Sequence, residues 1–299
     1  MVDKKIPSDI SLGIEHTTRP YVKYNVAEGR AQGGEFGQVP FGRIENVRKV
    51  FGAARGAPDV VALDDASFTF EQGEFVSLLG PSGCGKTTLL KIIAGLIPHT
   101  AGRVVIDGEE VTGPYPNYGF VFQAPSLMPW RNIRDNVLFP MEILGRRDAA
   151  AVKRANMLLE RVGLGAFAGA RPHQLSGGMQ QRASLCRALI HAPKLLLMDE
   201  PFGALDELTR LDMNDLLLGI KDETGASVVF VTHSISEAVY LSDQVVVFST
   251  RPARVCDAFR VDLPSPRTHG ARFSHVFADT ERRAGEALGL VGAPEREVV

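Results

Sequence analysis

Short apolar runs alternate with amphipathic stretches along most of the chain. From about Val47 onward, runs rich in Val, Leu and Phe have the lengths of β-strands, and segments with helical apolar spacing separate them. The predicted strands are Phe75–Leu79, Gly119–Gln123, Lys194–Asp199, Ser227–Thr232 and Gln244–Phe248. Because strands that alternate with helices usually form a parallel sheet covered on both faces, the pattern predicts an α/β fold.

The pattern is helical only between Arg131 and Gln174. The apolar positions form two faces, one with Val137, Met141 and Leu144, the other with Val152, Leu158, Leu159 and Val162. A helical subdomain of about residues 124–190, inserted in the α/β core, is the simplest interpretation.

The two ends of the chain lack this periodicity. Residues 1–43 contain several glycines and are expected to form an irregular N-terminal extension, whereas residues 251–299 are rich in proline and arginine and are expected to form a trailing segment. The main domain is therefore predicted to span residues 44–250.

Composition narrows the class of protein. The 299 residues include 33 Lys and Arg and 35 Asp and Glu, so the net charge of −2 argues against a nucleic-acid-binding protein. No apolar run approaches the roughly 18 residues of a membrane-spanning helix, and Met1–Lys5 does not begin a secretory signal. The three cysteines show no pairing pattern, and we expect a reducing cytoplasm.

The strongest chemical signal is Gly80–Thr88, which matches G-x-x-x-x-G-K-[ST] between a predicted strand and a predicted helix. Its glycines let successive N–H groups face a phosphate, Lys86 adds a full charge, and the Thr87 hydroxyl can ligate Mg²⁺. We therefore expect ATP and Mg²⁺ as ligands. The expected nucleotide-binding residues are Gly80, Ser82, Gly83, Cys84, Gly85, Lys86, Thr87 and Thr88.

The strand that ends at Asp199 supplies a second element. Asp199 is placed to bind Mg²⁺, and Glu200 can accept a hydrogen bond from an attacking water. A buried strand that simply ends in two solvated acids is the alternative interpretation.

A third element is Leu175–Arg182, where Ser176 can cap a helix and Gly177 and Gly178 expose its first N–H groups. Alone, this would more often be an ordinary cap and turn. However, the three elements occur in the order and near the spacing of Walker A, signature and Walker B, so the chain resembles the ABC ATPase family. The resemblance implies a P-loop NTPase core with an antiparallel β portion and an inserted helical subdomain.

In that family two ATPase domains pack head to tail, and each ATP lies between the phosphate loop of one and the signature of the other. The resemblance thus implies that Ser176, Gly177 and Gly178 act on the partner's ATP, and that Asp206 in Ala204–Asp206 lines the interface. The partner would be a second copy or a paralogous subunit.

Three further positions match the family. Gln123 is similar to the glutamine that senses Mg²⁺, with a polar strand end as the alternative, and His233 to the histidine that contacts the γ-phosphate, with a structural histidine as the alternative. Phe51 is expected to stack on adenine, or else belongs to the core. Ser234 and Glu237 predict a capping box after His233.

Other segments, namely Phe122–Trp130, Asn136–Phe139 and Arg251–Val255, resemble ATPase subunits of nitrate, sulfonate and taurine importers. The resemblance covers about residues 44–267. It departs from the group at Ala124, where an acidic residue is common, and in the N-terminal extension. It implies a prokaryotic subunit at the cytoplasmic face of the plasma (inner) membrane that energises uptake of a small anionic solute.

The partners implied are an integral membrane permease and, indirectly, a periplasmic or extracellular solute-binding protein. Leu127, Met128 and Trp130 either contact the permease or belong to the subdomain core. A soluble ABC ATPase acting on a protein assembly remains the alternative function. A regulatory module without turnover is disfavoured, because Lys86, Asp199, Glu200 and His233 are all present.

Overall fold

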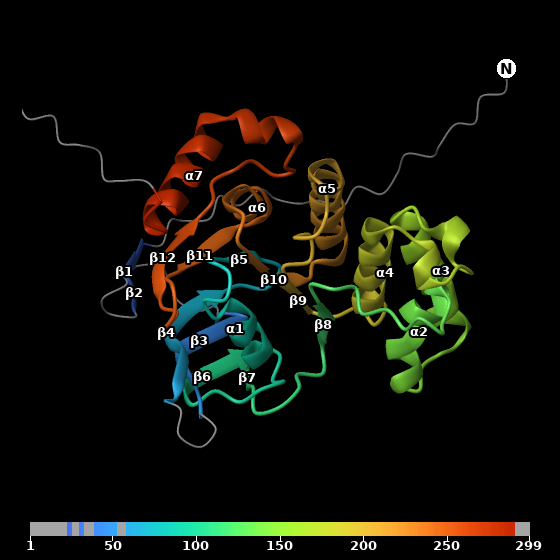
Figure 1. The fold of residues 1–299 in the computed structure, drawn as a ribbon, viewed down its shortest axis with the longest axis horizontal. Coiled ribbons are helices and arrows are strands. Elements are labelled where there is room, and N and C mark those ends of the chain that lie inside the picture. The colour runs from blue at the N-terminus through green and yellow to red at the C-terminus, as the bar shows by residue number, and fades with distance from the viewer. Residues whose placement is uncertain (1–22, 26–29, 33–38, 53–57, 291–299) are drawn as a thin grey trace, which may run out of the picture. The chain divides into compact units, whose positions relative to one another are not determined.

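The structure is a computed structural model that describes residues 23–25, 30–32, 39–52 and 58–290. Its central sheet has the strand order β12-β11-β5-β10-β9-β8, and every neighbouring pair is parallel except β11 with β12 (Figure 1). The strands are β5 (Phe75–Leu79), β8 (Tyr118–Val121), β9 (Leu195–Asp199), β10 (Ser227–Thr232), β11 (Gln244–Phe248) and β12 (Val255–Arg260). All five predicted strands are confirmed, and β5, β10 and β11 have the predicted bounds.

Apolar side chains cover both faces of this sheet, which explains why its strands appear in the sequence as continuous apolar runs. In β5, Phe75 and Leu79 belong to one core cluster and Val76 and Leu78 to another. The first cluster continues into the inserted helices, α5 (Glu207–Thr224) and α6 (Ile235–Leu241), and the second into α1 (Lys86–Ile93).

A second, antiparallel sheet packs on the α1 side and has the order β4-β3-β6-β7. Its strands are β3 (Gly42–Phe51), β4 (Val60–Phe70), β6 (Ala101–Ile106) and β7 (Glu109–Glu110). The predicted antiparallel portion of the fold is therefore confirmed, and α1 lies between the two sheets.

Three helices interrupt the chain between β8 and β9 and lie beyond the β8 edge of the sheet (Figure 1). They are α2 (Ile133–Ile143), α3 (Ala149–Arg161) and α4 (Gly177–Leu189), with 3-10 turns at Gly165–Phe167 and Pro172–Gln174. The expected face of α3 is confirmed, since Leu159 and Val162 are buried. The expected face of α2 extends one residue beyond the helix, because Leu144 directly follows its last residue and is exposed.

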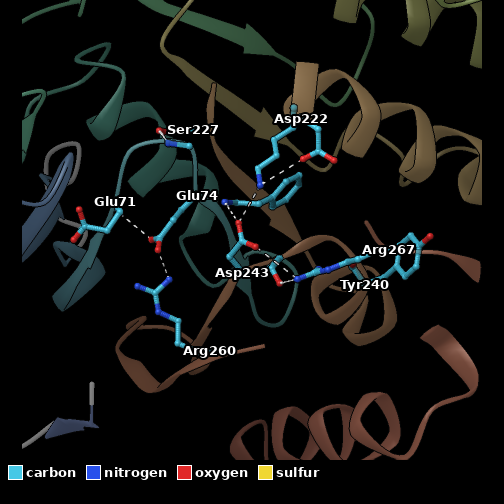
Figure 2. A network of polar contacts seen from close by, with 12 residues as sticks. Glu71, Glu74, Asp222, Ser227, Tyr240, Asp243, Arg260 and Arg267 are labelled. Atoms are coloured by element: carbon cyan, nitrogen blue, oxygen red, sulfur yellow. Dashed lines mark hydrogen bonds and ion pairs between the residues drawn. The ribbon is translucent and has the colours of Figure 1, made fainter. Parts of the chain in front are cut away.

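Regular structure continues after Thr250, where the sequence predicted a trailing segment without periodicity. After β12 come a 3-10 turn (His269–Phe273) and α7 (His275–Ala287), which contacts α6. Phe277 and Ala284 of α7 belong to the first core cluster, and polar contacts add to this packing (Figure 2): the buried Arg267 guanidinium donates to the carbonyls of Tyr240 and Ser242, both at 2.6 Å. Asp243 accepts from the Phe75 N–H and from Lys221, while Arg260 pairs with Glu74.

The N-terminal unit, residues 1–37, is described only at two short strands. β1 (Lys23–Asn25) pairs antiparallel with β2 (Arg30–Gln32), which the sequence did not predict. The rest of the expected extension up to Gln38, including its glycines at 29, 33, 34 and 37, lies outside the described residues. Across the described ranges, none of the helices combines the length and apolar character needed to cross a membrane.

Candidate functional site

The candidate site lies where the parallel strands end. Register fixes which residues meet there: Val231 pairs with Asp199, Thr232 with Leu79, and Val121 with Met198. The residues that follow these strands therefore share one edge of the sheet, the carboxyl edge at which open α/β sheets bind ligands. The expected site residues at this edge are Gly80, Gln123, Glu200 and His233.

The phosphate loop connects β5 to α1, as predicted. Gly83 and Gly85 have φ angles of 74° and 138°, which an L side chain rarely adopts. A Cβ on Gly85 would also lie 2.7 Å from the Ala62 carbonyl oxygen. Gly85 precedes α1 without a side-chain cap, so the first N–H groups of that helix are left for a ligand. In the same loop Ser82 is exposed, Cys84 is buried and Thr88 is half-buried.

Lys86 is buried inside this loop. Its Nζ donates to the carbonyl oxygens of Gly80 and Pro81 at 2.7 and 2.8 Å. The ammonium thus lies among the loop residues that are expected to surround phosphate.

Thr87, in the first turn of α1, contacts Asp199, the last residue of β9. The Thr87 hydroxyl donates to Asp199 Oδ1 at 2.6 Å. Burial raises the pKa of the Asp199 carboxyl above its ordinary value, and the Thr87 hydrogen bond opposes this shift. Within the described ranges, no group of three or more His, Cys, Asp or Glu side chains could hold a metal ion. This hydroxyl and carboxylate still fit Mg²⁺, which takes oxygen ligands and shares them with nucleotide phosphates.

Glu200 and His233 face each other from adjacent strand ends. Glu200 Oε2 lies 3.1 Å from His233 Nδ1. The backbone of Glu200 has a φ of 42°, a conformation that costs a non-glycine residue roughly 1–3 kcal/mol. Its N–H donates to the Val231 carbonyl at 3.0 Å. The sheet therefore holds this carboxylate in place despite the strain.

The predicted capping box after His233 forms only in part. The Ser234 hydroxyl accepts from the Glu237 N–H at 3.3 Å, as expected. The Glu237 carboxylate, however, accepts from the Thr232 hydroxyl, and the Ser234 N–H donates to that same hydroxyl. Thr232, directly before His233, therefore bonds to the Glu237 carboxylate in place of the Ser234 N–H.

Gln123 lies two residues beyond the end of β8 and is exposed. The segment that follows it is held by α4: Gln181 donates to the Phe122 carbonyl, and Arg187 to the carbonyls of Pro125 and Ser126. The segment after β8 and the helix that begins at the signature motif are therefore directly connected.

The signature residues lie apart from the phosphate loop. Ser176 caps α4 by accepting from the Met179 N–H at 3.3 Å, and both Ser176 and Gly177 are exposed. Asp206 caps α5, and hydrogen bonds from Thr209 lower the pKa of its carboxyl. A Cβ on Gly178 would lie 2.9 Å from Thr209 Cγ2, so the two caps are neighbours. Among the described residues, no hydrogen bond or ion pair joins Ser176 or Asp206 to the phosphate loop.

Phe51 ends β3 and is 42% exposed, which excludes the alternative that it belongs to the core. Lys49 Nζ lies 4.9 Å from its ring centroid.

The sequence did not predict that Arg251 contacts the phosphate loop. Its Nη2 donates to the Gly83 carbonyl at 2.6 Å, and the backbone nearby is fixed because the Ala253 N–H donates to the Ala62 carbonyl. No local pattern could have found this contact, because Arg251 and Gly83 are 168 residues apart in the chain.

The chain is similar in sequence and fold to known proteins. A family model described as ABC transporter matches residues 63–203. The chain is 46% identical to a taurine import ATP-binding protein of Rhizobium johnstonii, over 82% of this chain and 88% of the relative. It is 40% identical to an aliphatic sulfonates import ATP-binding protein of Bacillus cereus, over 75% and 88%.

A solved structure is also similar. It is a dimeric ATP-binding cassette in a post-hydrolysis state bound to ADP and Pi, with a TM-score of 0.65 and 33% identity over 73% of this chain and 98% of the other. Its likeness to this chain confirms the predicted fold class. The chain therefore belongs to the ABC transporter family and is one of its ATP-binding proteins.

Proposed function

We propose that this protein hydrolyses ATP as a dimer and thereby energises the import of a small anionic solute, of the taurine, sulfonate or nitrate type, through a separate permease. The observation that carries the hydrolysis step is the meeting of the phosphate loop, the Thr87–Asp199 pair and the Glu200–His233 pair at one sheet edge. The import role and the solute class rest on the similarity to importer subunits.

The roles of the side chains follow from their chemistry. The N–H groups of the loop, with Lys86, bind the phosphates, and Phe51 stacks on adenine. Thr87, Asp199 and Gln123 would hold Mg²⁺, which neutralises charge on the phosphate oxygens when bound. Glu200 orients the attacking water, and His233 contacts the terminal phosphate.

A second copy, or a paralogue, completes each site. Ser176, Gly177 and Gly178 are exposed or half-buried and have no polar contact with the phosphate loop of their own chain among the described residues. In a head-to-tail dimer they would bind the γ-phosphate held by the partner, and Asp206 would lie at the interface. The solved dimeric cassette is a precedent for such an assembly.

The segment directly before the inserted helices offers apolar side chains to the permease at the cytoplasmic face of the membrane. Trp130 is 71% exposed, directly before the helical insertion. Leu127 and Met128 are half-buried, and Leu127 packs on the core, so it contributes less to this surface. An exposed indole of this kind is typical of an anchor in an interface.

Purification of the tagged protein from native membranes tests the proposed function. We expect a polytopic permease to co-purify and, with its solute-binding protein and solute, to stimulate ATP hydrolysis. Trp130→Asp should abolish co-purification without changing ATP binding. Phe273→Asp, which alters a 90% exposed side chain outside the inserted helices, is the matched control and should retain the permease. Recovery of a soluble assembly complex without a membrane protein would instead support the alternative function.

A further inference from the structure

The buried carboxylate of Glu237 lies close to the guanidinium of Arg210, whose side chain is 26% exposed but whose Nε atom is buried. Arg210 Nε, in α5, lies 4.0 Å from Glu237 Oε1, in α6. Neither atom has a hydrogen-bond partner among the described residues, and the Glu237 side chain is 9% exposed. Since buried polar atoms are nearly always hydrogen-bonded, an unpaired donor and acceptor at this separation indicate a contact that forms in another state of the protein.

Glu237 already bonds to a residue beside His233. Its other carboxylate oxygen accepts from the Thr232 hydroxyl at 2.7 Å, and that hydroxyl accepts from the Ser234 N–H at 3.0 Å. Thr232 and Ser234 flank His233, which contacts Glu200. The Glu237 carboxylate is therefore connected, through the Thr232 hydroxyl, to the residues on both sides of His233.

Arg210 bonds to the residues on either side of Asp206. Its Nη2 donates to the Leu205 carbonyl at 2.8 Å, and its Nη1 to the exposed Glu207 carboxylate at 3.2 Å. Leu205 precedes Asp206, and a Cβ on Gly178 would contact Leu205 and Thr209. Arg210 is thus attached to the loop that packs beside the signature residues.

We propose that Arg210 and Glu237 are positioning residues for hydrolysis, and that Arg210 Nε bonds to Glu237 Oε1 when the nucleotide site closes. The proposal rests on the proposed ATPase function. It adds a direct contact between the segment Thr232–Ser234, which contains His233, and the loop at Leu205–Asp206. A shift of about 1 Å brings 4.0 Å to hydrogen-bond distance. Charged hydrogen bonds are strong at buried positions, so the closed contact holds His233 and Glu200 in one arrangement.

Steady-state hydrolysis and ATP binding by the full-length protein test this link. Glu237→Gln keeps an oxygen for Thr232 but removes the charge that faces Arg210, and Arg210→Gln removes the other charge. We expect each variant to lower kcat about tenfold with ATP affinity within twofold of wild type, and the double variant to fall no further. Glu207→Gln, which alters only the exposed partner of Arg210, is the matched control and should keep the wild-type kcat.

Three results would overturn the link: unchanged kcat in both single variants, additive losses in the double variant, or ATP affinity that falls in parallel with kcat. Thermal unfolding checks that the variants are folded. If a Gln variant does not fold, Glu237→Asp, which keeps the charge but shortens its reach, takes its place with the same expected and contrary results. Glu200→Gln is measured beside them, since wild-type hydrolysis by that variant would reject the proposed function rather than the link.

Discussion

Two residues of the site, Gly85 and Glu200, have backbone angles that most side chains avoid, and they do so for different reasons. Gly85 needs the absence of a Cβ, because the loop passes close to Ala62. Glu200 carries a side chain in spite of its φ, and its carboxylate lies at the sheet edge beside His233, where we propose that it orients the attacking water. Strain at a non-glycine residue is typical of functional positions.

Gly85→Ala should therefore distort the phosphate loop. The new Cβ would combine a φ of 138° with a 2.7 Å approach to backbone, which we expect to cost about 3 kcal/mol in the free energy of unfolding and to weaken ATP binding. Urea unfolding and nucleotide titration measure both effects. Gly83→Ala is the control, since its φ is positive but no atom lies within 4 Å of the new Cβ. Equal stability of the two variants would contradict the steric explanation.

At the level of elements, the sequence predicted the strands that are buried on both faces. β5, β10 and β11 were found with their bounds because every residue in them is buried and most are apolar. β12 and α7 were missed because their core residues, such as Phe259, Phe277 and Ala284, are few and are separated by exposed or partly exposed positions. In that region Arg267 and Arg283 bond to Tyr240 and Asp257, contacts between positions far apart in the chain.

Arg267→Ala should accordingly destabilise the C-terminal segment. The substitution leaves the carbonyls of Tyr240 and Ser242 without this donor and removes a buried charge near Asp243. We expect a loss of about 2–4 kcal/mol in the free energy of unfolding. Arg282→Ala, which removes an exposed pair with Asp279, should cost less than about 0.5 kcal/mol. Urea unfolding distinguishes them, and a similar small loss in both would show that Arg267 does not anchor the segment.

At the level of the whole molecule, the site residues fall into two groups: those at the carboxyl edge of the sheet, and the signature residues with Asp206. The sequence predicted the first, at the carboxyl edge of the sheet, because Asp199 ends a recognisable strand and Lys86 and His233 each follow one. It also predicted that Ser176 caps α4. It could not predict that Gly178 packs beside Thr209, or that the Thr232 hydroxyl replaces the Ser234 N–H as the partner of the Glu237 carboxylate, since side-chain packing decides both. The separation of the two groups is why we propose that activity requires a dimer.

The most direct test is to measure mass by light scattering, together with turnover, for Glu200→Gln with and without Mg·ATP. We expect this variant to bind ATP, to remain dimeric while ATP is present, and to hydrolyse it at least 100-fold more slowly than wild type, because the water-orienting carboxylate is lost. Lys86→Ala is the control and should neither bind ATP tightly nor dimerise. A Glu200→Gln protein that hydrolyses ATP at the wild-type rate and stays monomeric would contradict the account.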